Sequence, residues 1–249
     1  MNEKTEGLVL KELDYRENSI ILTVLSREYG RLSFIVQGAR RMTSKNRAGT
    51  LPYTRNEYQF DYKEGRNIFR LKTAVSLELF RWVHEDLNAS CAAAVLAELL
   101  DAFANDDADR DTAEFQYELY LEALKMLNEK RPADLVLAVS VSQLMKKEGI
   151  APYVDGCVLC GSSQVSAVSV SEGGFLCPKC VLKSSGRQLP SDSLQRFRLV
   201  SKAEQRHMPL LADRMDTCLQ ELSILIEMIR LHTGLPVRSY NLFQRLFRQ

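Results

Sequence analysis

The chain has 249 residues, of which 45% are hydrophobic and 26% are charged, and its formal net charge is +1. This composition is ordinary for a soluble globular protein, and the length allows two or three modules. The charge is uneven: Lys and Arg number 15 against 10 Asp and Glu in residues 1–81, 6 against 14 in 82–149, and 12 against 8 in 150–249. Such asymmetry between segments indicates a charged partner even where the total is nearly neutral.

No segment suggests export or membrane insertion. The first residues, M-N-E-K-T-E, contain acids and no apolar run, which is unlike a secretory signal. The longest apolar stretches, residues 92–100 and 222–229, are interrupted by Glu98 and Glu227 and are too short to span a bilayer. We therefore expect a cytoplasmic protein without a membrane partner.

Residues 7–77 read as five strands. Apolar or aromatic residues alternate in each of them, and a long insertion follows the third strand. The alternating residues are Val9, Leu13 and Tyr15, then Ile20, Leu22 and Val24, then Leu32, Phe34 and Val36, then Tyr58, Phe60 and Tyr62, and finally Phe69, Leu71, Thr73, Val75 and Leu77. The pattern predicts a small β-barrel, for which the five-stranded OB type is the first candidate and an SH3-like barrel the alternative.

The insertion after the third strand is strongly basic. No acidic residue lies between Glu28 and Glu57. The same stretch contains Arg31, Arg40, Arg41, Lys45, Arg47 and Arg55. A cationic loop on the rim of a barrel is suited to neutralise phosphates and displace their counterions, although surface cations also serve only solubility. We predict that these residues bind nucleic acid.

The last two strands allow two interpretations. Exposed rings at Tyr58, Phe60, Tyr62 and Phe69 would stack on unpaired bases, whereas buried rings would fill the barrel, which is the commoner use of such a stripe. Arg70 and Lys72 occupy the opposite strand face and would extend the basic surface.

From about Asp86 the pattern changes to that of amphipathic helices. We predict helices beginning near Asp86, over 112–129 and over 132–148, and a helix from Asp192 capped by Ser191. A last long helix carries Leu211, Met215, Cys218, Leu222, Leu225 and Ile229 on one seam and ends at Gly234. Cys91 and Cys218 are expected to be buried thiols. Arg196, Arg198 and Lys202 on the helix after Ser191 are weaker nucleic-acid candidates, because charges spaced in this way usually form a solvated face.

Two Cys-x-x-Cys pairs, Cys157/Cys160 and Cys177/Cys180, are separated by sixteen residues. This spacing is typical of a four-thiolate zinc site built from two short knuckles. A pair of disulfides or a redox motif is the alternative, but disulfides seldom persist in a reducing compartment. Four thiolates leave no open position for water, so the predicted Zn²⁺ is structural, and a zinc-dependent hydrolase is disfavoured.

The order of these parts resembles the RecO family of bacterial recombination mediators. The resemblance is carried by E-G-L-V-L-K at residues 6–11, Glu17 to Gly30, Q-G-A-R-R at residues 37–41, and the G-C-V-L-C-G and C-P-K-C knuckles. It implies an α+β multidomain protein, with an OB-type barrel over 1–80, a helical domain over 81–150 and 189–249, and a four-cysteine, zinc-ribbon-like module over 151–188. Some relatives lack the cysteines, so the metal is not essential to the family activity.

The resemblance also implies a function in recombinational DNA repair. Family members bind single- and double-stranded DNA, anneal complementary strands and act together with RecR. They also bind the C-terminal tail of single-stranded DNA-binding protein and so help RecA to load onto coated DNA. We accordingly expect a nucleoid-associated, non-enzymatic DNA-binding protein whose contacts are electrostatic. The alternative is a protein–protein adaptor that does not bind DNA directly.

Overall fold

A computed structural model describes residues 2–41, 44–63, 65–66, 68–104 and 109–247. The chain forms two compact units, Met1–Lys130 and Arg131–Gln249. Among the described residues, no helix combines the length and the apolar character needed to cross a bilayer. The predicted boundaries near residues 80, 150 and 188 describe a finer division, which stays a prediction.

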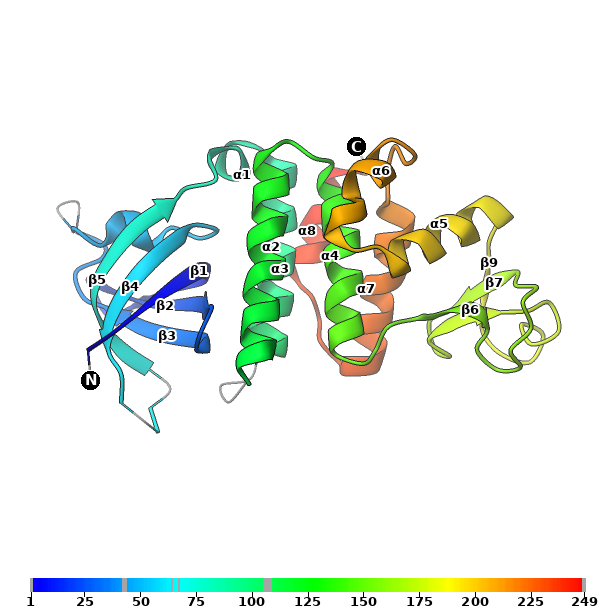
Figure 1. Cartoon of the computed structure of the whole chain (residues 1–249), viewed down its shortest axis with the longest axis horizontal. Helices are drawn as coiled ribbons and strands as arrows, with labels where there is room; N and C mark the ends of the chain where they lie inside the picture. The colour runs from blue at the N-terminus through cyan, green and yellow to red at the C-terminus, as the bar shows by residue number, and fades with distance from the viewer. Residues whose placement is uncertain (1, 42–43, 64, 67, 105–108, 248–249) are drawn as a thin grey trace. The chain divides into compact units, whose positions relative to one another are not determined.

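The first unit begins with a closed five-stranded barrel (Figure 1). Its elements are β1 (Asn2–Tyr15), β2 (Ser19–Ser26), β3 (Gly30–Val36), the short 3-10 helix η1 (Arg47–Thr50), β4 (Arg55–Asp61) and β5 (Ile68–Glu78). The strand order is β1-β2-β3-β5-β4, with β1 pairing β4 to close the barrel and β3 parallel to β5. This arrangement confirms the OB-type barrel.

The alternating residues of the middle strands form the barrel core. Leu22 lies opposite Phe34 and Val24 lies opposite Leu32, and all four side chains are buried. The alternation does not hold along all of β5, because its register against β4 shifts beside Phe60. Beyond that shift Val75 and Leu77 are 54% and 47% exposed. A register shift turns the following side chains to the other face, which the residue pattern alone does not reveal.

Three helices complete the first unit: α1 (Arg81–Glu85), α2 (Leu87–Phe103) and α3 (Arg110–Asn128). Asp86 caps α2, since its side chain accepts the Ala89 N–H at 2.8 Å. The apolar residues in the middle of α2 are buried, and Cys91 is a buried thiol as expected, whereas Leu87 at the start of the helix is 59% exposed.

The second unit combines helices with a small sheet (Figure 1). Its helices are α4 (Ala133–Lys147), α5 (Ser191–Lys202), η2 (Gln205–His207), α6 (Met208–Ala212), α7 (Leu219–Thr233) and α8 (Ser239–Leu246). The sheet has the order β6-β8-β7-β9, from β6 (Tyr153–Cys157), β7 (Ala167–Ser169), β8 (Gly174–Leu176) and β9 (Arg187–Gln188).

The prediction of a single long helix through residues 211–229 is wrong. Helix α6 ends at Ala212 and α7 starts at Leu219. The buried Asp134 carboxylate accepts the Cys218 N–H at 2.7 Å and the Thr217 hydroxyl at 2.6 Å, so the backbone between the helices is fixed by a side chain of α4. Cys218 is nevertheless buried, and Gly234 ends α7 with φ 75°, both as predicted.

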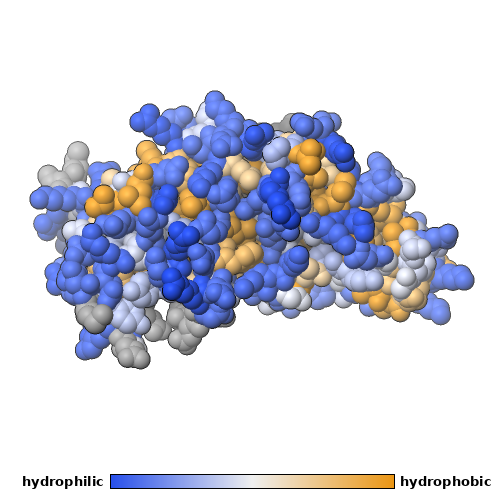
Figure 2. Space-filling view, in the orientation of Figure 1, coloured by the Kyte–Doolittle hydropathy of each residue, from blue (hydrophilic) through white to orange (hydrophobic). Residues whose placement is uncertain are grey.

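Two further helix features differ from expectation. Ser191 is the first residue of α5 rather than its cap, and Pro190 holds the cap position. Helix α8 was not predicted. Figure 2 shows that the visible surface is mostly hydrophilic and that apolar patches interrupt it.

Candidate metal centre and nucleic-acid interface

The four-cysteine cluster is assembled by two parallel strands. β6 and β8 pair in parallel and end at Cys157 and Leu176, so each delivers a Cys-x-x-Cys turn to the same edge of the sheet. In the first turn the Gly161 N–H donates to the Cys157 carbonyl at 2.8 Å, and Gly161 adopts φ 74°, which glycine tolerates best. In the second turn the Val181 N–H donates to the Cys177 carbonyl at 3.0 Å.

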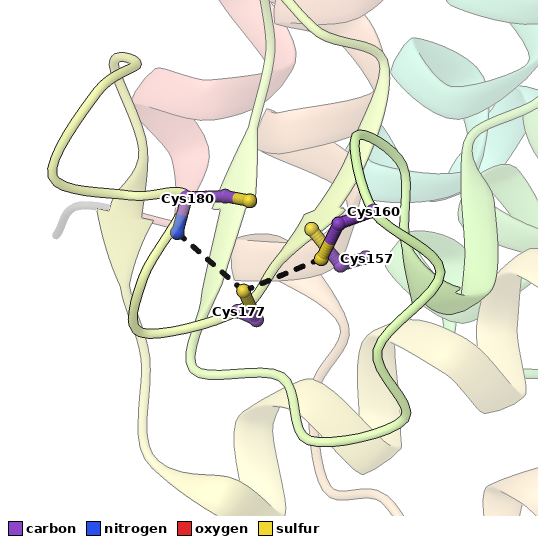
Figure 3. Close-up of side chains that lie close together, drawn as sticks. All are labelled: Cys157, Cys160, Cys177 and Cys180. Atoms are coloured by element: carbon purple, nitrogen blue, oxygen red, sulfur yellow. Dashed lines mark hydrogen bonds between the residues drawn. The ribbon is translucent and has the colours of Figure 1, made fainter.

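The geometry of the cluster fits a tetrahedral ion. The four Sγ atoms all lie within 4.8 Å of one another, and those of Cys160 and Cys177 are 3.7 Å apart (Figure 3). A tetrahedron with Zn–S bonds of about 2.3 Å has S–S edges of roughly 3.8 Å. All six cysteines of the chain are free thiols, so the structure does not pair these sulfurs as disulfides.

Backbone donors favour thiolates in this cluster. Burial opposes ionisation of Cys157, but N–H groups of the knuckles outweigh it and lower its pKa to about 6. The Cys180 N–H lies 3.4 Å from the Cys177 Sγ, and this bond is the main cause that lowers the pKa of Cys177. Hydrogen bonding with the Cys177 and Cys160 sulfurs instead raises the pKa of Cys180 to about 12, so the thiolate is favoured at Cys157 and Cys177. The four sulfurs together form the kind of donor set that a thiophilic cation prefers.

The module around the cluster has little apolar core of its own. Its buried cluster consists of Cys157, Ala167, Leu176 and Cys177. Phe175 turns instead toward Phe197 of α5, with ring centroids 5.9 Å apart. A module this small ordinarily needs a metal or disulfides for stability. The cluster is suited to hold the module together.

Four of the predicted barrel cations form ion pairs within the first unit. Arg31 and Arg55 are the least exposed, and Arg31 pairs with Asp101 at 2.8 Å, whereas Arg55 pairs with Glu6 at 2.6 Å. The pairs of the more exposed cations are Arg40 with Asp14 at 3.4 Å and Lys72 with Asp61 at 2.6 Å.

These ion pairs shift the pKa values of their carboxylates. The hydrogen bond from Arg55 is the main reason that the pKa of Glu6 is lowered. Burial opposes ionisation of Asp101, but hydrogen bonds from Arg31 and Lys11 outweigh it, so the pKa of Asp101 is lowered as well. Arg31 and Arg55 thus serve the structure of the unit, whatever else they bind.

A second group of cations is exposed and makes no ion pair with a described residue. Arg41, Lys45 and Arg47 lie on the connection between β3 and β4, and Arg70 lies on β5, where it donates to the Gln37 side chain at 3.1 Å. Lys63 and Arg66 are exposed in the β4–β5 connection in the same way. Sequence reasoning missed these last two, although OB barrels commonly bind oligonucleotides through that loop.

The aromatic stripe is mostly core. Tyr58 and Phe60 are fully buried, and Phe69 is 6% exposed. Tyr62 alone of the four is accessible, at 36% exposed, and its ring stacks on Phe69 with centroids 5.5 Å apart. Three of the four rings are thus unable to stack on bases.

The weaker candidates in the second unit are also paired. Arg196 binds the buried Glu221 at 3.1 Å, while Arg198 and Lys202 both pair with Asp155. The structure does not bring these three cations to the surface as unpaired charges.

Comparison with known proteins places these features in one family. A model described as "Recombination protein O N terminal" matches residues 1–80, and one described as "Recombination protein O C terminal" matches residues 84–241.

The chain belongs to the RecO family.

Individual relatives named RecO support the same family assignment. The chain is 32% identical over 178 residues to the "DNA repair protein RecO" of Exiguobacterium sibiricum, covering 71% of this chain and 70% of the relative. It is 30% identical over 181 residues to that of Bacillus pumilus, covering 72% and 69%, and 29% identical over 188 residues to that of Bacillus subtilis, covering 75% and 72%. Membership in RecO places the chain among proteins of DNA repair.

Proposed function

We propose that the chain is a recombination mediator that binds single- and double-stranded DNA and anneals complementary strands. The observation that carries the proposal is a set of exposed cations on an OB-type barrel that make no ion pair with a described carboxylate, namely Arg41, Lys45, Arg47 and Arg70. Arg40 and Lys72 join them, because exposed ion pairs are weak and exchange readily for phosphate. Arg31 and Arg55 stabilise the same unit through their ion pairs with Asp101 and Glu6.

The mechanism is electrostatic. Two DNA strands repel each other through their phosphates, and a cationic surface that holds both offsets the repulsion. Because most rings of the barrel are buried, contact with the backbone rather than with bases accounts for binding. Binding of this kind is largely independent of sequence and accommodates single and double strands, as annealing requires. The proposal includes no covalent step.

We propose Zn²⁺ as the ion of the cysteine cluster, with Cys157, Cys160, Cys177 and Cys180 as its ligands. Zinc would supply structural cross-linking of the two knuckles, since all four positions are thiolates. The proposed DNA contacts lie in the other unit.

We propose that partner proteins complete the activity: RecR, which acts with the chain in loading RecA, and the C-terminal tail of single-stranded DNA-binding protein. An apolar groove in the second unit suits an acidic tail that ends in Phe. It has a volume of about 240 Å³ and is lined by Leu199, Lys202, Ala203, His207, Leu210, Leu211 and Arg214. Leu210 is 62% exposed, and Arg214 is exposed without an ion pair to a described residue.

The groove is tested by Arg214→Glu in the full chain, measured against a labelled peptide of that tail. The variant should bind the peptide at least about tenfold more weakly, because one attractive charge becomes repulsive. Arg245→Glu, the same charge change at an exposed position of α8 outside the groove lining, serves as the control. Unchanged peptide affinity in Arg214→Glu would place the tail elsewhere.

DNA binding itself separates the mediator from an adaptor that contacts only proteins. A labelled oligonucleotide should bind with an affinity that falls as salt rises, and the chain should anneal complementary strands coated with single-stranded DNA-binding protein, faster when RecR is present. Absence of any salt-dependent DNA binding would favour the adaptor.

A further inference from the structure

The connection between β3 and β4 is fastened to the edge of β5. β5 pairs with β3 over residues 68–70, and no strand among the described residues pairs with its later residues on that side. There the side chain of Asn46 accepts the Ala74 N–H at 3.1 Å and donates to the Lys72 carbonyl at 3.4 Å. The amide of Asn46 thus meets the backbone of β5 in the way that a neighbouring strand would.

Contacts just after Asn46 hold the same segment. A Cβ on Gly49 would lie 2.4 Å from the Cβ of Ala74, so only glycine permits this approach. The Gly49 carbonyl accepts the hydroxyl of the buried Tyr58 at 2.9 Å, and that hydroxyl in turn accepts the Asn56 amide at 2.9 Å. The segment is therefore anchored both to the strand edge and to the barrel core.

This anchoring fixes the position of two cations. Lys45 and Arg47 flank Asn46 in the chain, and both are exposed without an ion pair to a described residue. The carbonyl that Asn46 contacts belongs to Lys72, whose side chain is exposed on the same strand. Asn46 carries no charge, but its two hydrogen bonds to β5 hold the neighbouring Lys45 and Arg47 at a fixed position relative to the cations of β5.

We propose that Asn46 is a positioning residue, which pre-organises Lys45 and Arg47 beside Arg70 and Lys72 for the phosphates of a nucleic-acid backbone. The inference rests on the proposed DNA-binding function. A loop ordered before binding loses less conformational entropy on binding, which strengthens affinity without adding a contact.

The number of phosphate contacts and the cost of ordering the loop are measured separately by salt dependence. The slope of log affinity against log salt counts phosphates, whereas loop order changes affinity at every salt concentration alike. Asn46→Ala in the full chain should therefore weaken binding of labelled oligothymidine by about three- to tenfold with the slope unchanged. Hydrogen exchange of the amides over residues 44–50 should become faster in the same variant.

Two companion variants complete the test. Lys45→Ala combined with Arg47→Ala should lower the slope by about 0.7 for each lost phosphate contact on a single strand. Asn18→Ala, in the β1–β2 turn of the same barrel, should change neither affinity nor slope. Denaturant unfolding followed by Trp82 fluorescence verifies that each variant is folded, and Asn46→Ser, which keeps a side-chain acceptor, replaces Asn46→Ala if that variant does not fold.

The outcomes distinguish the inference from the function on which it rests. If Asn46→Ala leaves affinity unchanged while the double variant lowers the slope, the positioning role is overturned and DNA binding by the loop stands. A lower slope in Asn46→Ala also overturns it, since contacts themselves would have been lost. If the double variant changes neither affinity nor slope, the loop is not the DNA contact and the proposed function fails at this surface.

Discussion

Replacing one cysteine of the cluster should unfold the small sheet and spare the barrel. The change is Cys177→Ser, which removes one buried sulfur of the proposed zinc site and leaves three cysteines. Structural zinc sites contribute about 10–16 kcal/mol to the folding of small peptides, and a whole domain is stable by only about 5–15 kcal/mol. The apolar cluster around the cysteines has four buried residues, two of them cysteines, and Val154, Val168 and Phe175 are the further buried apolar residues of these strands. Without the proposed metal, we expect this core to be too small to keep β6–β9 ordered.

The single tryptophan of the chain makes the assay specific. Trp82 lies in α1 of the first unit, where its backbone N–H donates to the Asn128 side chain at 3.0 Å and the Lys130 Nζ lies 4.1 Å from its ring centroid. In Cys177→Ser the zinc content should fall and amide exchange over residues 153–188 should become fast. The unfolding midpoint reported by Trp82 fluorescence should not move.

Cys91→Ser is the matched control. Cys91 is a buried thiol of the first unit, outside the cluster, so a hydroxyl there should cost about 1–3 kcal/mol in the Trp82 transition and leave zinc content unchanged. A lower Trp82 midpoint or a changed DNA salt slope in Cys177→Ser would refute the view that the metal serves only its own module.

Two further predictions concern a buried carboxylate, Asp134, and a partly buried one, Asp101. Asp134→Ala leaves the buried N–H of Cys218 without its acceptor. The free energy of unfolding in urea, followed by circular dichroism, should therefore fall by about 1–3 kcal/mol. An unchanged unfolding midpoint would show that the break between α6 and α7 does not depend on Asp134. Burial opposes ionisation of Asp101, but the hydrogen bonds from Arg31 and Lys11 outweigh it, so the pKa of Asp101 is lowered. The ionised Asp101 therefore stabilises the fold above the unfolded pKa of about 3.9, and this stabilisation is lost as pH falls through the lower folded pKa. Asp101→Asn should therefore destabilise the first unit at pH 7, as followed by Trp82 fluorescence, and should lose less stability than the wild type as pH falls below about 4. An acid response like that of the wild type would contradict this.

Much of the fold follows from local patterns in the sequence. The period-two residues of β2 and β3 identify the barrel core, because each strand presents one face to it, and the knuckle spacing identifies the four cysteines that converge. Gly234 ends α7 because the chain needs positive φ there. Each of these signals is contained in one short continuous stretch of the sequence.

The predictions that the structure contradicts depend on contacts between residues far apart in the sequence. Asp134 interrupts the predicted long helix from more than eighty positions away in the chain, and no helical period contains that information. The basic loop likewise looks uniform in sequence, yet Arg40 meets Asp14 of another strand while Arg41 meets no described carboxylate. Only the fold separates paired cations from unpaired ones, and no sequence signal could have distinguished these neighbours.

The central claim is that the barrel cations without an ion pair to a described residue contact the DNA backbone, and salt dependence tests it most directly. The variant changes Arg41, Lys45, Arg47 and Arg70 to Ala together, and the control of equal charge changes the ion-paired Lys4, Arg27, Lys125 and Arg187. Four lost phosphate contacts should lower the single-strand slope by about 2.8, so that between about 50 and 200 mM salt the wild type loses on the order of 50-fold more affinity than the variant. The control should keep the wild-type slope. Equal slopes in the wild type and the four-cation variant would contradict the account.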